Sequence, residues 1–287
     1  MRSRALQIVE VGPRDGLQSE PDPLATEVKV LLIERLMDAG LRRIEATSLV
    51  SPTAVPQLGD AEAVLASISR RAGVEISALV PNMRGYERAL AAAVDRIAVF
   101  TSASETFAGR NIRCTIDESF ARFGPVVTAA TAAGIPVRGY VSMSWHCPYE
   151  GAVDPEAAVA VVRRLGALGC DEIALADTVG TASPDEVTGL LERVAAVVSM
   201  ERVAVHLHDT SGQALANVEA AVLAGVRIFD GAVGGLGGCP FAPGSPGNVD
   251  TNDLVSVLER LGFDTGIDVV KLAGAADIVR PVTRRAA

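Results

Sequence analysis

Short apolar runs alternate with longer amphipathic stretches along the whole chain. Each short run is rich in apolar and β-branched residues and is bounded by turn-forming residues, which is typical of a β-strand. Eight such strands are predicted, at residues 5–12, 42–48, 74–81, 95–102, 136–143, 171–177, 202–209 and 226–234. Because helical stretches separate the strands, the pattern indicates a parallel sheet built from strand–helix units.

Six stretches between the strands have apolar residues at helical spacing. These predicted helices cover residues 26–39, 117–133, 155–168, 184–198, 213–224 and 250–261. Cap-type residues precede several of them, namely Asp154 before Pro155, Ser183 before Pro184, and either Asp250 or Thr251. Such residues satisfy the free N–H groups of a first helical turn, so they support the predicted boundaries.

Eight strand–helix units in 287 residues come close to the roughly 250 residues of a typical (β/α)8 barrel. We therefore predict an α/β fold, a closed (β/α)8 TIM barrel that forms a single domain over residues 1–287. A doubly wound open sheet is the alternative that periodicity leaves open. The run GGLGGCPFAPGSPGN at 234–248 follows the eighth strand and predicts a glycine-rich lid loop over the site. A dinucleotide-binding fingerprint would instead follow the first strand.

Composition and charge narrow the class of partner. The formal net charge is −9 and aromatic residues make up 4% of the chain, which argues against a nucleic-acid-binding protein. No apolar run reaches the roughly 20 residues needed to cross a bilayer, so we expect no membrane partner. The strand pattern begins near the N-terminus and the four cysteines lack CxxC spacing, so we expect a cytoplasmic protein with reduced thiols.

Two of the three histidines, His206 and His208, stand two positions apart at the end of the seventh predicted strand. Residues i and i+2 of a strand point to one face, so the two imidazoles can bind one divalent ion. In isolation, such a pair is more often two unrelated polar residues. In a barrel, however, the carboxyl ends of all strands meet at one rim. Other groups suited to chemistry stand at the ends of four further strands, namely Arg14, Asp15, Glu45, Asp177, Cys239 and Asn248.

The residue types at this rim suggest what they do. The two histidines, Asp15 and Asn248 offer nitrogen and oxygen ligands without thiolates, a set that favours Mg²⁺ or Mn²⁺ over a structural zinc ion. Cys239 stands in a polar loop and can carry a proton, because thiol pKa values lie near the working range. Asp177 is interpreted either as support for other site residues or as a substrate contact, and His146 either as a pocket residue or as a solvated one.

Several segments together resemble the 3-hydroxy-3-methylglutaryl-CoA lyase family of metal-dependent TIM-barrel lyases and synthases. They are VEVGPRDGLQSE, IEATSLVSPTAVPQL, RGYVSM, CPYEG, VHLHDTSGQALAN and GLGGCPFAPGSPGN, and the resemblance runs in order over about residues 6–272. The resemblance implies an acyl-CoA substrate that is cleaved to acetoacetate and acetyl-CoA. It also implies a divalent cation, a homodimer, and a place in leucine degradation and ketone-body formation.

The resemblance further implies a role for each rim residue. The ligands of the cation would be Asp15, His206, His208 and Asn248. Arg14 would stabilise the negative charge on the thioester enolate, and Cys239 would protonate that carbanion. The base that deprotonates the substrate's tertiary hydroxyl stays open between His206 and a water molecule on the cation.

Glu45 and Asp177 would be polar catalytic residues, with Glu10 behind them as support, and Arg14 and Asp177 would contact the substrate. The chain departs from the family pattern at several positions, some of which we expect to line the acyl or CoA pocket. They include Trp145, His146, Ala174, Ala176 and Ser211. These departures leave the exact acyl group open.

Two other functions remain as alternatives. One is a related lyase or aldolase that acts on a different 3-hydroxyacyl-CoA, or a synthase that runs in the condensing direction. The other is a barrel that binds without catalysis, which we would expect to have lost a ligand or the thiol. All of these residues are present in the sequence, which favours the enzyme.

Overall fold

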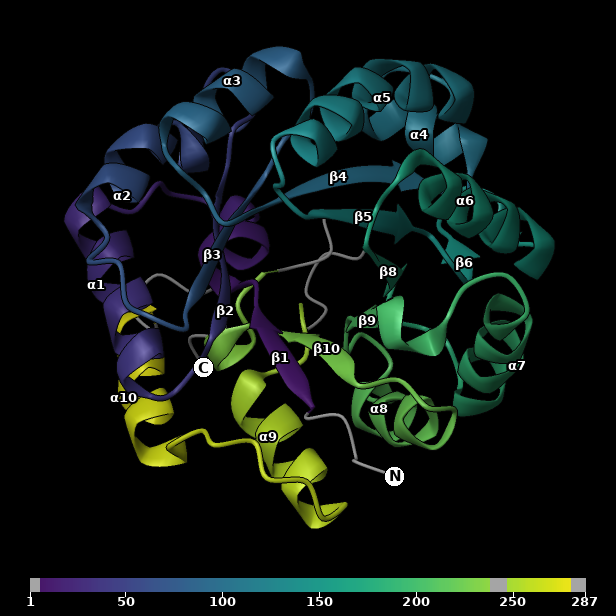
Figure 1. The fold of residues 1–287 in the computed structure, drawn as a ribbon. Helices are drawn as coiled ribbons and strands as arrows, with labels where there is room; N and C mark the ends of the chain where they lie inside the picture. Colours follow the sequence, from purple (N-terminus) through teal and green to yellow (C-terminus); the bar gives the residue numbers. More distant parts are fainter. Residues whose placement is uncertain (1–5, 238–246, 280–287) are drawn as a thin grey trace.

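The strands pair in parallel around a closed circle in the computed structural model, which describes residues 6–237 and 247–279 (Figure 1). Their order around the circle is β1-β10-β9-β8-β5-β4-β3-β2. The strands are β1 (Gln7–Glu10), β2 (Arg43–Ser48), β3 (Glu75–Leu79), β4 (Arg96–Ser102), β5 (Val137–Ser142), β8 (Glu172–Asp177), β9 (Val203–Leu207) and β10 (Ile228–Gly231). Each lies within a predicted run. The prediction of an α/β TIM barrel is therefore confirmed, and the open sheet is excluded.

Helices form a ring outside the strands (Figure 1). In the described ranges they are α1 (Thr26–Asp38), α2 (Ala61–Ser67), α3 (Met83–Ala91), α4 (Glu105–Asn111), α5 (Ile116–Ala132), α6 (Pro155–Leu168), α7 (Pro184–Ala195), α8 (Ala214–Leu223), α9 (Thr251–Arg260) and α10 (Val269–Val279). The six predicted helices correspond to α1 and α5 to α9. The prediction missed α2, α3, α4 and α10. Helices α2 and α4 have only seven residues each, too few for a helical period to repeat clearly.

Two helix starts show how local sequence sets the boundaries. Ser183 and Glu186 form a reciprocal capping box at the start of α7. Asp250 accepts a hydrogen bond from the backbone N–H of Asn252 at 2.9 Å, so Asp250, rather than Thr251, caps α9. A short hairpin that the prediction also missed, formed by β6 (His146–Cys147) and β7 (Gly151–Ala152), follows β5. No helix in the described ranges combines the length and apolarity that a membrane span needs.

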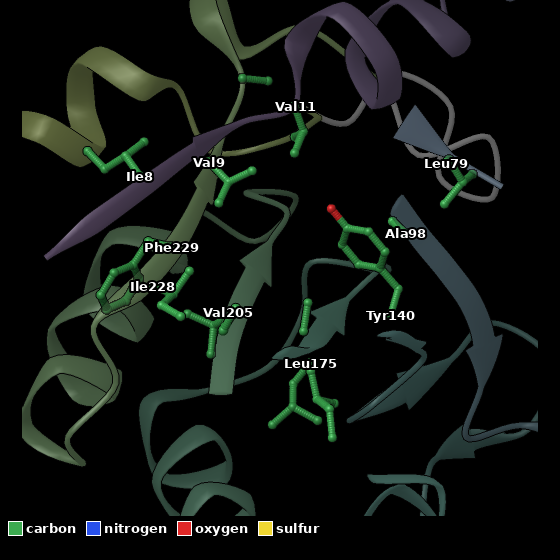
Figure 2. Close-up of a cluster of buried hydrophobic side chains, with 14 of the residues drawn as sticks. Ile8, Val9, Val11, Leu79, Ala98, Tyr140, Leu175, Val205, Ile228 and Phe229 are labelled. Carbon is green, nitrogen blue, oxygen red and sulfur yellow. The ribbon is translucent and has the colours of Figure 1, made fainter. Parts of the chain in front are cut away.

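The two faces of the barrel strands carry different chemistry. The register pairs Ile8 with Phe229 and Phe229 with Val205, so these three side chains share the outer face and pack in the apolar core beneath the helices. Figure 2 shows Ile8 and Phe229 on that side, whereas the ring of Tyr140 lies inside the barrel. The inner face is rich in polar and charged groups, unlike the apolar layers that fill a typical barrel.

Four charged residues close the amino-terminal end of the barrel interior, and we call them the floor cluster: Arg43, Glu75, Arg138 and Glu172. Arg43 Nη1 lies 2.9 Å from Glu172 Oε2, and Arg43 Nε lies 2.9 Å from Glu75 Oε1. Arg138 Nε lies 3.3 Å from Glu172 Oε1. Each buried charge therefore has a partner of opposite sign, which offsets the cost of removing it from water.

Candidate active site

A pocket of about 400 Å³ opens at the carboxyl ends of the strands. This is the end of a barrel at which catalytic groups gather. Its apolar wall comes from β3, β4 and the helices above them, and includes Leu79, Val80, Phe100, Phe107 and Phe123. Its polar lining includes Arg14, Asp15, Gln18, Tyr140, His206 and His208.

The loop after β1 carries Arg14 and Asp15 into this pocket. It forms a single π-helical turn, η1 (Gly12–Gly16), directly after the strand. The turn passes very close to the segment after β10, because a Cβ atom at Gly16 would lie 2.6 Å from Cβ of Leu236. Only glycine allows this approach, so the spacing of GPRDG sets where the arginine and the aspartate emerge.

Three potential ligands converge at the mouth of the barrel, and we call them the cation cluster: Asp15, His206 and His208. The Nε2 atoms of the two histidines lie 3.3 Å apart. Oδ2 of Asp15 lies 3.7 Å from Nε2 of His206 and 3.9 Å from Nε2 of His208. One potential ligand atom of each residue lies within 4.8 Å of the others. The two imidazoles thus share one face, as the strand period predicts.

The chemistry of the cation cluster suits a divalent cation. Burial, together with the charge of His206, lowers the pKa of His208 to about 4, so this ring is neutral near pH 7. Burial alone would raise the pKa of Asp15, but Arg14 and the two histidines outweigh it and hold that pKa below its usual range. Once Nε2 of each imidazole is deprotonated, the carboxylate and both nitrogens offer lone pairs that a cation would satisfy together.

Asn248 joins the cation cluster from the carboxyl end of the predicted lid. It forms an isolated β-bridge with His208. Its Nδ2 donates to Oδ2 of Asp15 at 3.0 Å and to the carbonyl of Leu236 at 3.1 Å. The four residues predicted as ligands are therefore neighbours in the structure.

Arg14 lies buried beside the cation cluster, between two carboxylates. Its Nε donates to Oε2 of Glu45 at 2.7 Å, and its Nη1 donates to Oδ1 of Asp15. The guanidinium carbon also lies 5.3 Å from the centroid of the Tyr140 ring. Burial alone would lower the pKa of Arg14, but Glu45 and Asp15 outweigh it and raise that pKa. Arg14 therefore places a permanent positive charge beside the cation cluster, and Arg122 lines the same pocket.

Glu10 is buried behind the rim and joins the first loop to the segment after β10. Its Oε1 accepts hydrogen bonds from the backbone N–H groups of Gly12 and Val233, each at 2.9 Å, and its Oε2 accepts one from the Thr251 hydroxyl at 2.7 Å. Burial raises the pKa of Glu10 to about 7, although these hydrogen bonds lower it. The geometry agrees with the supporting role expected for this residue.

Asp177 ends β8, and its carboxylate holds the loop that follows. Its two oxygens accept from the backbone N–H groups of Gly180 and Ala182, both at 2.9 Å. The register pairs Ala176 with His206, so Ala176 faces the pocket and Asp177 faces the other side of the strand. Of the two interpretations of Asp177, this geometry favours support for the site over direct contact.

Most of the residues that depart from the family pattern lie outside the pocket. Trp145 Nε1 donates to the carbonyl of Glu186 at 3.1 Å, and His146 Nε2 lies 3.0 Å from the carboxylate of the same residue. The β6–β7 hairpin therefore turns this segment toward α7. Ala176 lines the pocket, whereas none of Trp145, His146, Ala174 and Ser211 lines its described part. The expectation is therefore confirmed for Ala176 and wrong for these four residues.

Cys239 and most of the predicted lid lie outside the described residues, which end at Gly237 and resume at Gly247. The described ends of this segment meet, because Asn248 donates to the carbonyl of Leu236. Both ends of the predicted lid therefore lie beside the cation cluster.

Sequence reasoning missed three buried residues inside the barrel: Arg138, Tyr140 and Asp230. The Tyr140 hydroxyl donates to Oε2 of Glu45 at 3.2 Å. Oδ2 of Asp230 lies 3.0 Å from Nδ1 of His206, and its Oδ1 accepts from Nη2 of Arg138 at 2.6 Å. A sequence feature that could have revealed such residues is a polar residue at every second position of a buried strand, as in VRGYV at 137–141.

Comparison with known proteins identifies the family. The HMGL-like family model matches residues 5–279. The chain belongs to the HMGL-like family. Among the curated members, hydroxymethylglutaryl-CoA lyase of Pseudomonas mevalonii is 51% identical over 270 residues, which cover 94% of this chain and 90% of the relative.

Solved structures of this family have the same fold. The HMG-CoA lyase from Brucella melitensis matches with a TM-score of 0.96 and 49% identity, over 98% of this chain and 100% of that one. An HMG-CoA lyase from Acinetobacter baumannii, solved in complex with coenzyme A and 3-methylmalate, matches with a TM-score of 0.92 and 39% identity, over 98% of this chain and 93% of that one. The family expected from the sequence motifs is confirmed.

Proposed function

We propose that this protein is a carbon–carbon lyase that cleaves 3-hydroxy-3-methylglutaryl-CoA to acetoacetate and acetyl-CoA, with Mg²⁺ or Mn²⁺ as its cation. The observation that carries the proposal is the position of the cation cluster and the buried Arg14 in one pocket. The reaction needs a hydroxyl activated at one point and a negative charge stabilised at another. The names of the relatives agree with this reaction, and the Acinetobacter baumannii structure contains coenzyme A.

The cation would be held by the carboxylate, the two imidazole Nε2 atoms and the amide oxygen of Asp15, His206, His208 and Asn248. When bound, it would supply positive charge that draws substrate oxygens and eases loss of the hydroxyl proton. Arg14 would hold the thioester carbonyl, with its own position set by Glu45. The apolar wall of the pocket would exclude water from the reacting carbons.

Cleavage would begin when the tertiary hydroxyl passes its proton to a base, either His206 or a water molecule near Asp15. The electron pair of the O–H bond forms a ketone as the adjacent carbon–carbon bond breaks, and the pair from that bond moves onto the acyl-CoA fragment as an enolate. Arg14 would stabilise the enolate oxygen. The thiol proton of Cys239 would then pass to the carbanion carbon and complete acetyl-CoA. The role of Cys239 rests on its residue type and on the family pattern.

Three further acidic residues would position this machinery. Glu45 would orient Arg14, Asp177 would order the loop after β8, and Glu10 would join the Arg14 loop to the segment after β10. Glu45 and Asp177 remain part of the proposed catalytic machinery. Both would act through the groups that they hold in place.

The test is an assay of purified protein with 3-hydroxy-3-methylglutaryl-CoA that detects acetoacetate, with and without a chelator. Cys239→Ala is compared with Cys170→Ala, which removes a buried thiol just before the start of β8, at the opposite end of the barrel. We expect Mg²⁺-dependent cleavage that falls about 10²- to 10⁴-fold in Cys239→Ala and stays unchanged in Cys170→Ala. Cation binding without cleavage would overturn the substrate. Cleavage of another 3-hydroxyacyl-CoA, or condensation, would identify one of the alternatives.

We further propose that the protein acts in the cytoplasm as a homodimer of single-domain chains, within leucine degradation and ketone-body formation. The cysteines in the described ranges are free, which agrees with a reducing compartment. The dimer rests on the family resemblance. Analytical ultracentrifugation would show a single species of twice the chain mass, and calorimetry would show one cooperative unfolding transition. A monomer would overturn the homodimer, and two separate transitions would overturn the single domain.

A further inference from the structure

Asp230 faces His206 across neighbouring strands, directly behind the cation cluster. Its Oδ2 lies 3.0 Å from Nδ1 of His206, and both residues are at least 95% buried. The strands that carry them, β10 and β9, pair in parallel, so both side chains reach this contact inside the barrel. The opposite nitrogen of the same imidazole, Nε2, faces Asp15 and His208. Asp230 therefore contacts the outer side of a ring whose inner side belongs to the site.

Asp230 can only accept a hydrogen bond in this arrangement. Arg138 Nη2 donates to Oδ1 at 2.6 Å, and the Tyr140 hydroxyl lies 3.4 Å from Oδ2. Arg138 can only donate, so Oδ1 is an acceptor, and both the Tyr140 hydroxyl and Nδ1 of His206 face Oδ2 as potential donors. The shared hydrogen must therefore belong to Nδ1 of His206. In a neutral ring, Nε2 then carries a free lone pair, which is the form that binds a cation.

His208 has no such partner. Its Nδ1 is buried and makes no hydrogen bond with the described residues, while its Nε2 lies 3.3 Å from Nε2 of His206. Because Nε2 of His206 is an acceptor, Nε2 of His208 must donate when the cation is absent. The proton of His208 must then move to Nδ1 before its Nε2 can bind a cation. Two histidines on one strand thus differ in how far they are prepared for binding.

We propose that Asp230 is a positioning residue that holds His206 in its Nδ1–H tautomer, with Arg138 holding Asp230 in turn. This inference deepens the proposed function and rests on its cation site. Carboxylates that hold the far nitrogen of a ligating histidine typically contribute about 10- to 100-fold to metal affinity or activity. Asp230 would act only through His206, without contact with the substrate.

The tautomer can be read in the wild-type protein, because the chain has only three histidines. In cation-free protein labelled with ¹⁵N-histidine, long-range ¹H–¹⁵N correlation spectra distinguish an Nδ1–H ring from an Nε2–H ring. The variant His206→Gln assigns one set of signals. We expect His206 to be entirely in the Nδ1–H form. A mixture of tautomers, or the Nε2–H form, would overturn the proposal, whether or not any variant of Asp230 folds.

Two isosteric variants separate positioning from a general disturbance of the barrel interior. Asp230→Asn and Glu172→Gln each replace a buried carboxylate next to Arg138 by a neutral amide, but only Asp230 contacts His206. We expect the Mn²⁺ affinity measured by calorimetry to fall about 10- to 100-fold in Asp230→Asn. We expect it to stay near the wild-type value in Glu172→Gln. Equal losses in both variants, or no loss in Asp230→Asn, would overturn the proposal.

An activity assay on the same samples keeps this inference distinct from the proposed function. A wild-type protein that cleaves the substrate while His206 populates both tautomers would leave the lyase standing and overturn the role of Asp230. An Nδ1–H tautomer with the expected loss of Mn²⁺ affinity, in a protein that cleaves no 3-hydroxy-3-methylglutaryl-CoA, would support the role of Asp230 and overturn the substrate.

Discussion

The two ends of the barrel interior use buried polar groups in opposite ways. In the floor cluster, each charge has an opposite charge beside it, and Arg43 lies 2.9 Å from both Glu75 and Glu172. In the cation cluster, three groups that offer lone pairs lie within 4.8 Å of one another. Buried polar groups are normally matched by a complementary partner. Each charge of the floor is therefore matched within the protein, although Nε and Nη1 of Arg138 make no hydrogen bond with the described residues, whereas the mouth is arranged so that a cation could match it.

Burial alone does not distinguish charged groups that stabilise the fold from those that serve function. The neighbours of each group distinguish them: an adjacent opposite charge stabilises the fold, whereas several potential ligand atoms side by side create a binding site. Arg138 and Asp230 connect the two ends, since Arg138 contacts Glu172 at one end and Asp230, which holds His206, at the other. A change at either end should therefore show whether stability and cation binding are separable.

The largest expected effect is at the floor. Arg43→Met leaves Glu172 with one partner fewer inside the barrel, so we expect the free energy of unfolding to fall by about 3–5 kcal/mol. Urea denaturation measures this loss, and Mn²⁺ calorimetry on the folded protein should show little change. The double variant Arg43→Met/Glu172→Met should recover part of the stability, because an apolar pair replaces the ion pair. A loss of cation affinity with intact stability would contradict the comparison.

A second test measures how the unfolding free energy depends on pH through Glu10, which is buried behind the rim. Because Glu10 has a pKa near 7 in the folded protein and near 4.5 in the unfolded chain, the folded state favours its protonated form. Its contribution is complete below pH 4.5 and is lost as the pH rises through 7. Relative to Glu10→Gln, the wild-type unfolding free energy should therefore fall by about 3 kcal/mol over that interval. Parallel pH profiles for the two proteins would show that folding leaves the pKa of Glu10 unchanged.

The third change is at the mouth. His208→Leu removes one ligand of the cation cluster, so we expect Mn²⁺ affinity to fall about a hundredfold or more. The unfolding free energy of the cation-free protein should stay the same or rise, because a buried Nδ1 without a partner in the described ranges is replaced by an apolar group. Calorimetry and urea denaturation measure the two effects separately. A large loss of stability with unchanged affinity would assign His208 to the fold instead.

The smallest expected effect is at an exposed ion pair, and it tests whether burial decides how much an ion pair contributes to stability. Arg193 and Glu156 form an ion pair at 2.8 Å, close to the distances in the floor cluster, but their side chains are 55% and 60% exposed. Arg193→Ala should lower the unfolding free energy by no more than about 1 kcal/mol, because water screens the pair. The measurement is the same urea denaturation as for Arg43→Met. A loss equal to that of Arg43→Met would show that distance, and not burial, decides the contribution.

Much of the fold could be predicted because its signals are local. Alternating strands and helices, and caps such as Ser183, are properties of short segments, so all eight barrel strands were located. Helices α2 and α4 were missed because a seven-residue helix carries too little of its period. Trp145 and His146 were assigned to the pocket because the end of β5 was known but the turn of the β6–β7 hairpin was not.

The sequence by itself determined the barrel and the set of groups at its rim. Strand ends in a closed parallel barrel must meet, so Asp15, His206, His208 and Asn248 could be placed together before any coordinates. Only the tertiary structure decided how the interior is connected. Whether Asp230 reaches Nδ1 of His206 depends on the register between β10 and β9, and register is a property of two strands together. The same holds for the floor cluster, whose charges come from separate strands and meet only when the circle closes.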